Sequence, residues 1–322
     1  MNHAAKRVVI SGASSGIGAA TALAFAAQGA RLVLAARGRE GLDAIAERAR
    51  SAGAEQVHVH AADVTDADAV VRLVQEATGV LGGVDLWFSD VGVGVVGRFP
   101  DVPMADHARV IDANLVSHMN EAHALIPIFL AQGHGIWVNM ISVGGFVATP
   151  WAAAYSASKF GLRGFSQALR AELSKEPRIH ICDVYPTFVD TPGIDHAGNY
   201  TGGALGLPAG ALAPETVANA VVRLADRPRN TTVVGAPAIA LKLAQLLTPN
   251  LGAAVINGFF DTYFPRAQPA PATDGALFEA GAPTGPAGGR RRPDQRRTAA
   301  LAVGGLAAVG LGLWLAGRRR EG

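Results

Sequence analysis

Residues 8–25, VVISGASSGIGAATALAF, combine three local signals in a fixed order. A short apolar run leads into a glycine-rich turn, and the turn leads into a segment with helical composition. Glycine is needed where a chain turns sharply and where backbone must approach a pyrophosphate without a Cβ atom in the way. The N-terminus of the next helix offers free N–H groups to phosphates. This order predicts a dinucleotide-binding turn made by Gly12, Ser14, Ser15, Gly16, Ile17 and Gly18.

Outward from this turn, strand-like and helix-like segments alternate from residue 6 to about residue 235. Several strand-like runs are apolar almost throughout, as expected when both faces of a sheet are buried. The alternation predicts an α/β fold, a Rossmann-like doubly wound parallel sheet of about seven strands with helices on both faces. The strand-like runs are 8–11, 32–35, 57–60, 84–88, 136–141, 179–184 and 231–234, and the helical segments are 19–28, 42–52, 68–78, 105–130 and 153–174.

The composition is that of a globular protein with an ample core. Of 322 residues, 49% are hydrophobic and 17% are charged, with a formal net charge of +2. Eight of the 28 basic residues are arginines between Arg290 and Arg320, so the basic character belongs to the C-terminal tail and does not indicate nucleic-acid binding. The single cysteine, Cys182, allows no disulfide within the chain, and residues 1–7 lack the apolar core of a signal peptide. We expect a cytoplasmic catalytic domain.

Changes of composition divide the chain. Residues 1–265 form the expected catalytic domain, in which residues 237–265 are an apolar C-terminal helical region. That region could close over a substrate cleft or lie on a membrane surface, and the sequence does not separate these alternatives. Residues 266–298 are rich in Pro, Gly and finally Arg, which predicts a flexible linker that buries no core.

The next segment, residues 299–317, contains no charged residue. At 1.5 Å per residue a helix of this length matches the ~30 Å hydrocarbon layer of a bilayer. Arginines stand at both ends, and residues 318–322 form a short basic tail. We therefore predict a transmembrane helix that anchors the protein while the catalytic domain stays in the cytoplasm. The alternative is a buried helix of the main domain.

The end of the second strand-like run indicates which dinucleotide binds. An acidic residue there would hold the ribose hydroxyls of NAD, but the run ends in Ala36-Arg37. Arg37 offers a permanently charged, planar group to a 2′-phosphate, and Ser14 can add a hydroxyl. The sequence favours NADP(H) over NAD(H).

Further motifs at ordered spacings resemble those of the short-chain dehydrogenase/reductase family. Tyr155-Ser156-Ala157-Ser158-Lys159 matches Tyr-x-x-x-Lys, Ser142 stands thirteen residues before the tyrosine, and Asn114 matches the asparagine of the central helix. The resemblance covers residues 6 to about 235. It implies that Asn114, Ser142, Tyr155 and Lys159 are catalytic, and that Asp63 and Val64 contact adenine. The cofactor set it implies also includes Gly92, Tyr155, Lys159, Pro186, Val189 and Thr191.

Physical reasoning supports these roles. Residues four apart on a helix share a face, so Tyr155 and Lys159 can act together. A free tyrosine has a pKa of about 10, and a neighbouring ammonium with the positive nicotinamide is expected to lower that pKa. Tyr155 would exchange a proton with the substrate oxygen while Ser142 holds that oxygen. Asn114 would position a water that continues the proton path.

The sequence departs from the family pattern at two places. Ser89-Asp90-Val91-Gly92 stands where the family usually has Asn-Asn-Ala-Gly, which brings a carboxylate close to the adenosine side of the cofactor. Pro186-Thr187 replaces the family's Pro-Gly at the nicotinamide pocket. Neither change touches the proton-transfer residues.

These observations predict an oxidoreductase that transfers a hydride between nicotinamide and a carbonyl or secondary alcohol, acting on a small hydrophobic substrate. We expect a homo-oligomer and no metal site, since neither His58/His60 nor His118/Glu121/His123 completes a ligand pattern. The alternatives are a non-catalytic dinucleotide sensor with this fold and a membrane scaffold whose functional element is the tail.

Overall fold

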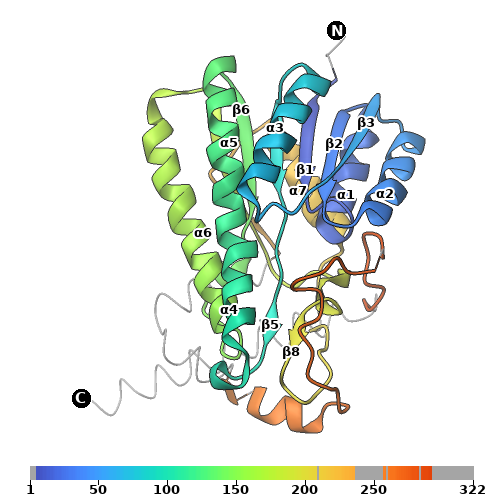
Figure 1. Ribbon diagram of the computed structural model, residues 1–322, viewed down its shortest axis with the longest axis vertical. Helices are drawn as coiled ribbons and strands as arrows, with labels where there is room; N and C mark the ends of the chain where they lie inside the picture. Colours follow the sequence, from blue (N-terminus) through green and yellow to red (C-terminus); the bar gives the residue numbers. More distant parts are fainter. Residues whose placement is uncertain (1–4, 209, 236–256, 259, 283, 292–322) are drawn as a thin grey trace.

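The computed structural model describes residues 5–208, 210–235, 257–258, 260–282 and 284–291 (Figure 1). Within this part of the chain seven parallel strands form one sheet in the order β3-β2-β1-β4-β6-β7-β9. The strands are β1 (Arg7–Ser11), β2 (Arg31–Ala36), β3 (Gln56–Ala61), β4 (Leu86–Ser89), β6 (Gly135–Met140), β7 (Ile179–Pro186) and β9 (Thr231–Val234). This sheet confirms the predicted fold class.

Helices cover both faces of the sheet (Figure 1). One apolar layer joins one face to α1, α2 and α7, and a second joins the other face to α3 and α5, with α6 packed against it. The helices are α1 (Gly16–Ala26), α2 (Arg39–Ser51), α3 (Ala67–Leu81), α4 (Met104–Ile111), α5 (Ser117–Gln132), α6 (Ala153–Glu172) and α7 (Pro214–Leu224). Because both faces are covered, β1 and β4 are buried almost throughout.

The strand order reverses beside β1, which pairs with β2 on one side and with β4 on the other. In open parallel sheets the crevice at such a reversal, outside the carboxyl ends of the strands, is where ligands bind. The glycine-rich turn follows β1 at this point, so the topology directs attention to this edge of the sheet.

Two features of the central region differ from the sequence prediction. The single helix expected over 105–130 is divided into α4 and α5 by a π-helical turn at Asp112–Val116. A small second sheet pairs β5 (Val95–Val96) with β8 (Gly198–Asn199) below the main sheet (Figure 1). Strands of two residues are too short for a periodic pattern, so the sequence could not reveal them.

The C-terminal part of the described chain is packed on the domain. The composition of residues 266–298 predicts a linker without buried side chains, yet Leu277 has no exposed surface. Backbone bridges join Pro269 to Gly203 and Thr273 to Asn199. The segment packs mainly through backbone groups, which a Pro- and Gly-rich composition does not exclude.

The predicted transmembrane helix at 299–317, the basic tail 318–322 and most of the apolar region 237–265 lie outside the described residues. In the part of the chain that is described, no helix is long and apolar enough to cross a membrane.

Candidate active site

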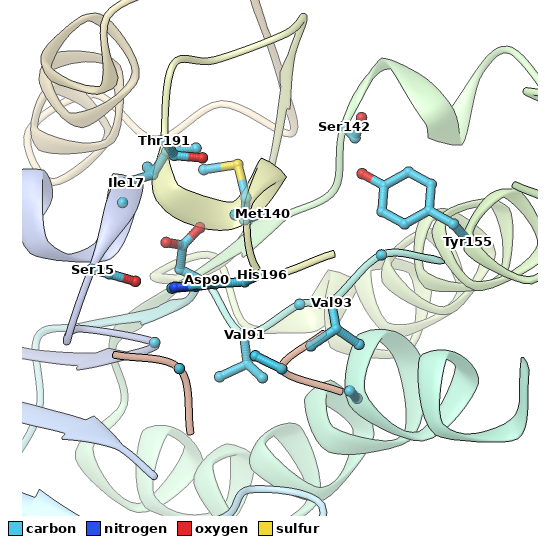
Figure 2. A pocket seen from close by; sticks show the side chains of 18 of the residues that line it. Ser15, Ile17, Asp90, Val91, Val93, Met140, Ser142, Tyr155, Thr191 and His196 are labelled. Carbon is cyan, nitrogen blue, oxygen red and sulfur yellow. The ribbon is translucent and has the colours of Figure 1, made fainter. Parts of the chain in front are cut away.

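A cavity of about 550 Å³ opens at the carboxyl ends of β1, β4 and β6 (Figure 2). Almost all the residues predicted from the sequence line it, although they come from segments far apart in the chain. The exceptions are Gly18, inside the glycine turn, and Asn114, which is fully buried. The predicted residues that line the cavity are Gly12, Ser14, Ser15, Gly16, Ile17, Arg37, Asp63, Val64, Gly92, Ser142, Tyr155, Lys159, Pro186, Val189 and Thr191.

The glycine turn leaves no room for side chains at two positions. Gly12 has φ +77°, and a Cβ atom there would lie 2.7 Å from the carbonyl oxygen of Asp90. A Cβ atom on Gly18 would lie 2.2 Å from the carbonyl oxygen of Gly12. The turn is therefore tightly packed on itself and on the end of β4, and it leads into the N-terminus of α1, where a phosphate cradle is expected.

The hydroxyl end of Tyr155 lies beside Ser142 in the cavity, and the two side chains are hydrogen-bonded (Figure 2). Ser142 has φ 139°, a conformation that non-glycine residues rarely adopt, and its Oγ accepts a hydrogen bond from the Gly144 N–H at 3.1 Å. Burial raises the pKa of Tyr155, and the hydrogen bond with Ser142 opposes this rise. Tyrosine is thus held as the protonated acid.

Lys159 lies one turn further along α6 and is 3% exposed. Its Nζ donates to the carbonyl oxygen of Met140 at 3.1 Å and lies 5.9 Å from the centre of the Tyr155 ring. Burial lowers the pKa of Lys159 to about 8, although the charge of Asp90 opposes this shift. Burial is the largest influence on the Tyr155 pKa, and the Lys159 ammonium is held at the end of β6 by the Met140 carbonyl.

Asn114 sits in the π-helical turn, behind the cavity wall. Its Oδ1 accepts from the Val93 N–H at 2.7 Å, and its Nδ2 donates to the Val93 carbonyl at 2.9 Å and to Ser158 Oγ at 3.1 Å. All side-chain donors of Asn114 are therefore committed to the loop after β4 and to α6. Irregular turns of this kind within helices are frequent at functional sites.

Asp90 is the carboxylate that the sequence carries in place of the family's Asn-Asn-Ala-Gly pattern, and it lies at the end of β4. A hydrogen bond with the Gly18 N–H joins it to the glycine turn, and it interacts electrostatically with Lys159. Burial raises the pKa of Asp90 to about 8 against the opposing charge of Lys159. The sequence predicts an effect of Asp90 only near the adenosine side of the cofactor. In the structure its carboxyl group also interacts with Lys159 of the Tyr-x-x-x-Lys motif.

The adenosine side of the cavity carries two arginines. Arg109 forms an ion pair with Asp63 at 2.8 Å. The pKa of Asp63 is lowered overall: burial raises it, but hydrogen bonds from Thr65 and Arg109 lower it by more. Arg37 is half-buried and donates only to two backbone carbonyls, those of Ala276 and Leu277. Burial lowers the pKa of Arg37. A half-buried guanidinium bonded to neutral oxygens fits a site for a phosphate group.

The segment after β7 closes the cavity opposite the glycine turn. Val189 bridges to Leu212, and the Asp190 N–H donates to the Leu212 carbonyl at 2.9 Å. Thr191 lies beside Gly16, where a Cβ atom would stand 3.5 Å from the threonine methyl group. The glycine turn, Arg37 and this segment together fit an extended dinucleotide.

Three of the histidines singled out in the sequence, His58, His60 and His118, have protein partners. His58 and His60 both contact Glu76, the latter at 2.6 Å, and His118 contacts Asn139 at 2.8 Å and the Val91 carbonyl at 2.9 Å. Among the residues that the structure describes, no group of three or more His, Cys, Asp or Glu side chains could hold a metal ion.

Sequence reasoning missed several residues of the cavity. Arg109, on α4, is an ordinary basic residue of an amphipathic helix in the sequence, and His196 follows no motif. Ala276, Ala280, Gly281 and Ala282 come from the segment expected to be a linker. No local pattern marks these residues, because only tertiary packing brings them to the cavity.

Comparison with known proteins places this fold and site in a family. Residues 6–199 match the family model described as short chain dehydrogenase. The uncharacterized oxidoreductase YxnA of Bacillus subtilis is 30% identical over 281 residues, which cover 85% of this chain and 78% of that protein. The ketoacyl reductase HetN of Nostoc sp. is 29% identical over 242 residues, covering 75% and 83%. The chain belongs to the short chain dehydrogenase family.

Solved structures agree with this assignment. An alcohol dehydrogenase from the archaeon Thermococcus sibiricus, complexed with 5-hydroxy-NADP, is similar with a TM-score of 0.62 and 27% identity over 71% of this chain and 94% of that one. A metagenomic short-chain oxidoreductase in complex with NADP has a TM-score of 0.61 and 28% identity over 71% and 97%. The protein is therefore an oxidoreductase of this family.

Proposed function

We propose that the protein is an NADP(H)-dependent oxidoreductase that reduces a carbonyl group, or oxidises the corresponding secondary alcohol, with Tyr155 as general acid and base. The observation that carries the proposal is the meeting of Tyr155, Ser142 and Lys159 at one cavity beside the glycine turn. The NADP ligands of two similar solved structures support the choice of cofactor.

The cofactor would be held along the whole edge of the sheet. The glycine turn would hold the pyrophosphate, Arg37 and Ser14 the 2′-phosphate, and Lys159 the nicotinamide ribose. Asp63 and Val64 would flank the adenine, and Gly92, Pro186, Val189 and Thr191 would complete the walls. Bound NADP(H) supplies the hydride donor or acceptor, and the protein supplies orientation and proton transfer.

The hydrogen bonds of the cavity indicate which side chains would transfer the proton. Because burial keeps Tyr155 protonated, its O–H is ready to donate to a carbonyl oxygen as the hydride arrives at carbon. The Ser142 Oγ accepts from Gly144, which leaves its own O–H to hold the same oxygen. Lys159 can then stabilise the tyrosinate from its place on the same face of α6.

The substrate side of the cavity is apolar. Phe188, Pro150 and Phe260 line it near Tyr155. Phe260 stacks on Phe264 at 5.4 Å, and the Trp151 ring lies 5.0 Å from that of Phe264, but Trp151 and Phe264 line a separate, smaller pocket. The apolar side chains of Phe188, Pro150 and Phe260 support a small hydrophobic carbonyl or alcohol as substrate.

Attachment to a membrane through residues 299–317 is a separate part of the proposal. It rests on the apolar sequence between arginines, and it is tested by alkaline extraction of membranes from cells that make the full chain. A chain that ends at residue 298 is the control. Release of both proteins by alkali would contradict the anchor.

The enzymatic proposal is tested by NADPH oxidation over a panel of hydrophobic aldehydes and ketones, with NADH as comparison. Tyr155→Phe, which keeps the ring and removes the acid, is expected to lower turnover ~10²-fold or more while NADPH binding persists. Unchanged turnover in Tyr155→Phe would remove the tyrosine from the mechanism. Failure of both dinucleotides to bind would remove the proposed function.

A further inference from the structure

The segment 267–291 follows the cofactor cavity from end to end. We call its described residues, 267–282 and 284–291, the strap. The strap starts antiparallel to β8, where Thr273 and Asn199 exchange backbone hydrogen bonds of 3.0 and 2.8 Å. It then crosses the adenosine side of the cavity, which Ala276, Ala280, Gly281 and Ala282 help to line. In Figure 1 the strap is the orange-red trace beneath the ends of β2 and β3.

The strap accepts hydrogen bonds from two of the five N–H groups of Arg37. Nη1 of Arg37 donates to the Leu277 carbonyl at 3.1 Å, and Nη2 donates to the Ala276 carbonyl at 2.8 Å. Arg109 Nε donates to the same Leu277 carbonyl at 2.9 Å. The guanidinium that the 2′-phosphate requires is thus bonded to the chain's own backbone.

The strap also takes a donor of the glycine turn. The Gly16 N–H donates to the carbonyl oxygen of Gly285 at 3.1 Å, and Ser15 and Gly285 form a parallel bridge. A phosphate oxygen and a peptide carbonyl cannot occupy the same donor at the same time. The contact therefore lies where the pyrophosphate is expected to bind.

Two anchors hold the strap at its ends. Leu277 has no exposed surface and packs in an apolar cluster with Val95, Val102 and Val110. Beyond Gly285, the backbone N–H groups of Arg290 and Arg291 donate to the Asp190 carboxylate, the latter at 2.8 Å. Asp190 belongs to the segment expected to contact the nicotinamide.

We infer that the strap is an intramolecular competitor of the dinucleotide, an autoinhibitory segment that must leave Arg37 and Gly16 before NADP(H) can bind. The inference rests on the proposed function, because it takes these residues as the phosphate sites. The strap offers neutral carbonyl oxygens, and a phosphate offers charged ones that bind arginine more strongly. Cofactor therefore displaces the strap at sufficient concentration, and the apparent dissociation constant rises as the open fraction falls.

A reversible lock tests the competition directly. A Cβ atom on Gly38 would lie 3.3 Å from the Ala280 Cβ, close to the about 3.5–4.5 Å of disulfides. Gly38→Cys combined with Ala280→Cys in the full-length chain should therefore cross-link the strap over the cavity, and the native Cys182 is buried. NADPH binding, measured by nucleotide fluorescence, is expected to weaken roughly tenfold or more on oxidation and to recover with dithiothreitol. Each single cysteine variant, treated in the same way, is the control.

A release variant tests the opposite state. Leu277→Asp should expel the strap and tighten NADPH binding roughly tenfold. Phe278→Asp places the same charge on a neighbouring side chain that is 46% exposed and is expected to leave binding within about twofold. Hydrogen exchange of residues 284–291 reports strap release independently. Linkage requires that NADPH also increase this exchange in the unaltered protein.

The outcomes separate the inference from the function on which it rests. Equal NADPH binding by the locked and reduced proteins would overturn the inference. So would weaker binding in Leu277→Asp, or protection of the strap by NADPH, since the strap would then be a cover that cofactor stabilises. If the reduced pair and Leu277→Asp bind no dinucleotide, the proposed function fails and the inference fails with it.

Discussion

The two halves of the cavity are built in different ways. On the side of Tyr155 every functional group is carried by a regular element or by the residue that ends one, and buried hydrogen bonds fix it from behind. On the side of Arg37 the wall is completed by a segment without regular structure, whose backbone carbonyls meet the arginine. The first half is positioned by the core, and the second half can rearrange without disturbing the core.

The difference teaches where chemistry and control can be expected in this molecule. Proton transfer needs groups held within hydrogen-bond distance, which a packed sheet and helix provide. Control of binding needs an element that can leave without unfolding the core, and the strap is held by one buried leucine, by hydrogen bonds and by the partly exposed Arg290–Asp195 ion pair.

The largest effect is expected at Lys159. Lys159→Met keeps the length of the side chain and removes the ammonium bonded to Met140, so turnover should fall ~10²–10⁴-fold. Lys175→Met removes an exposed lysine and is the matched control. Steady-state rates at saturating NADPH compare the two variants. Normal activity of Lys159→Met would contradict the proposal that the Tyr155 side of the cavity carries the catalytic groups.

The next effect concerns Glu121, a buried carboxyl group on α5 that accepts hydrogen bonds from Trp87 and Ser89 of β4. Burial raises the pKa of Glu121 from 4.5 to about 7, while hydrogen bonds from Ser11, Ser89 and Trp87 oppose the rise. The folded protein therefore binds more protons than the unfolded chain between pH 4.5 and 7, and the free energy of unfolding should fall as pH rises through this window. The loss is about 3 kcal/mol at most.

Glu121→Gln cannot titrate at this position, so it should lose less stability than the unaltered protein over that pH window, while Asp90, whose pKa burial also raises, titrates in both proteins. Urea unfolding at pH 5 and pH 7 measures the difference, with Glu172→Gln, at an exposed position of α6, as control. Parallel pH dependence in Glu121→Gln and the unaltered protein would show that another group is responsible.

A smaller effect is expected at Arg37, in the second half. Arg37→Ala removes the proposed partner of the 2′-phosphate and should lower the ratio of kcat/KM for NADPH to that for NADH ~10–100-fold. The strap competes with both dinucleotides, so the ratio isolates the phosphate contact from strap release. Arg39→Ala, which removes an exposed arginine paired with Asp43, should leave the ratio unchanged. An unchanged ratio in Arg37→Ala would place the 2′-phosphate elsewhere.

The last prediction compares the two halves by stability alone, and the smallest effect of all is expected in the strap. Phe88→Ala, in the centre of β4, should reduce the free energy of unfolding by ~3–5 kcal/mol. Leu277 is equally buried, yet Leu277→Ala should change it by less than ~1 kcal/mol, because the strap opens before the domain unfolds. Urea unfolding followed by tryptophan fluorescence measures both, and equal losses would make the strap part of the cooperative core.

The sequence by itself determined the sheet, and it predicted the glycine turn and the site residues Ser142, Tyr155 and Lys159. Strand and helix periods are local, and motifs such as Tyr155 and Lys159 depend on spacing along one helix, so both are legible without a structure. Only the tertiary structure decided that Asp90 faces Lys159, that Arg109 stands beside Arg37, and that a Pro- and Gly-rich segment returns to the cavity. The physical reason is that these contacts join distant segments, in the case of the strap through backbone carbonyls that every residue carries and no sequence pattern marks.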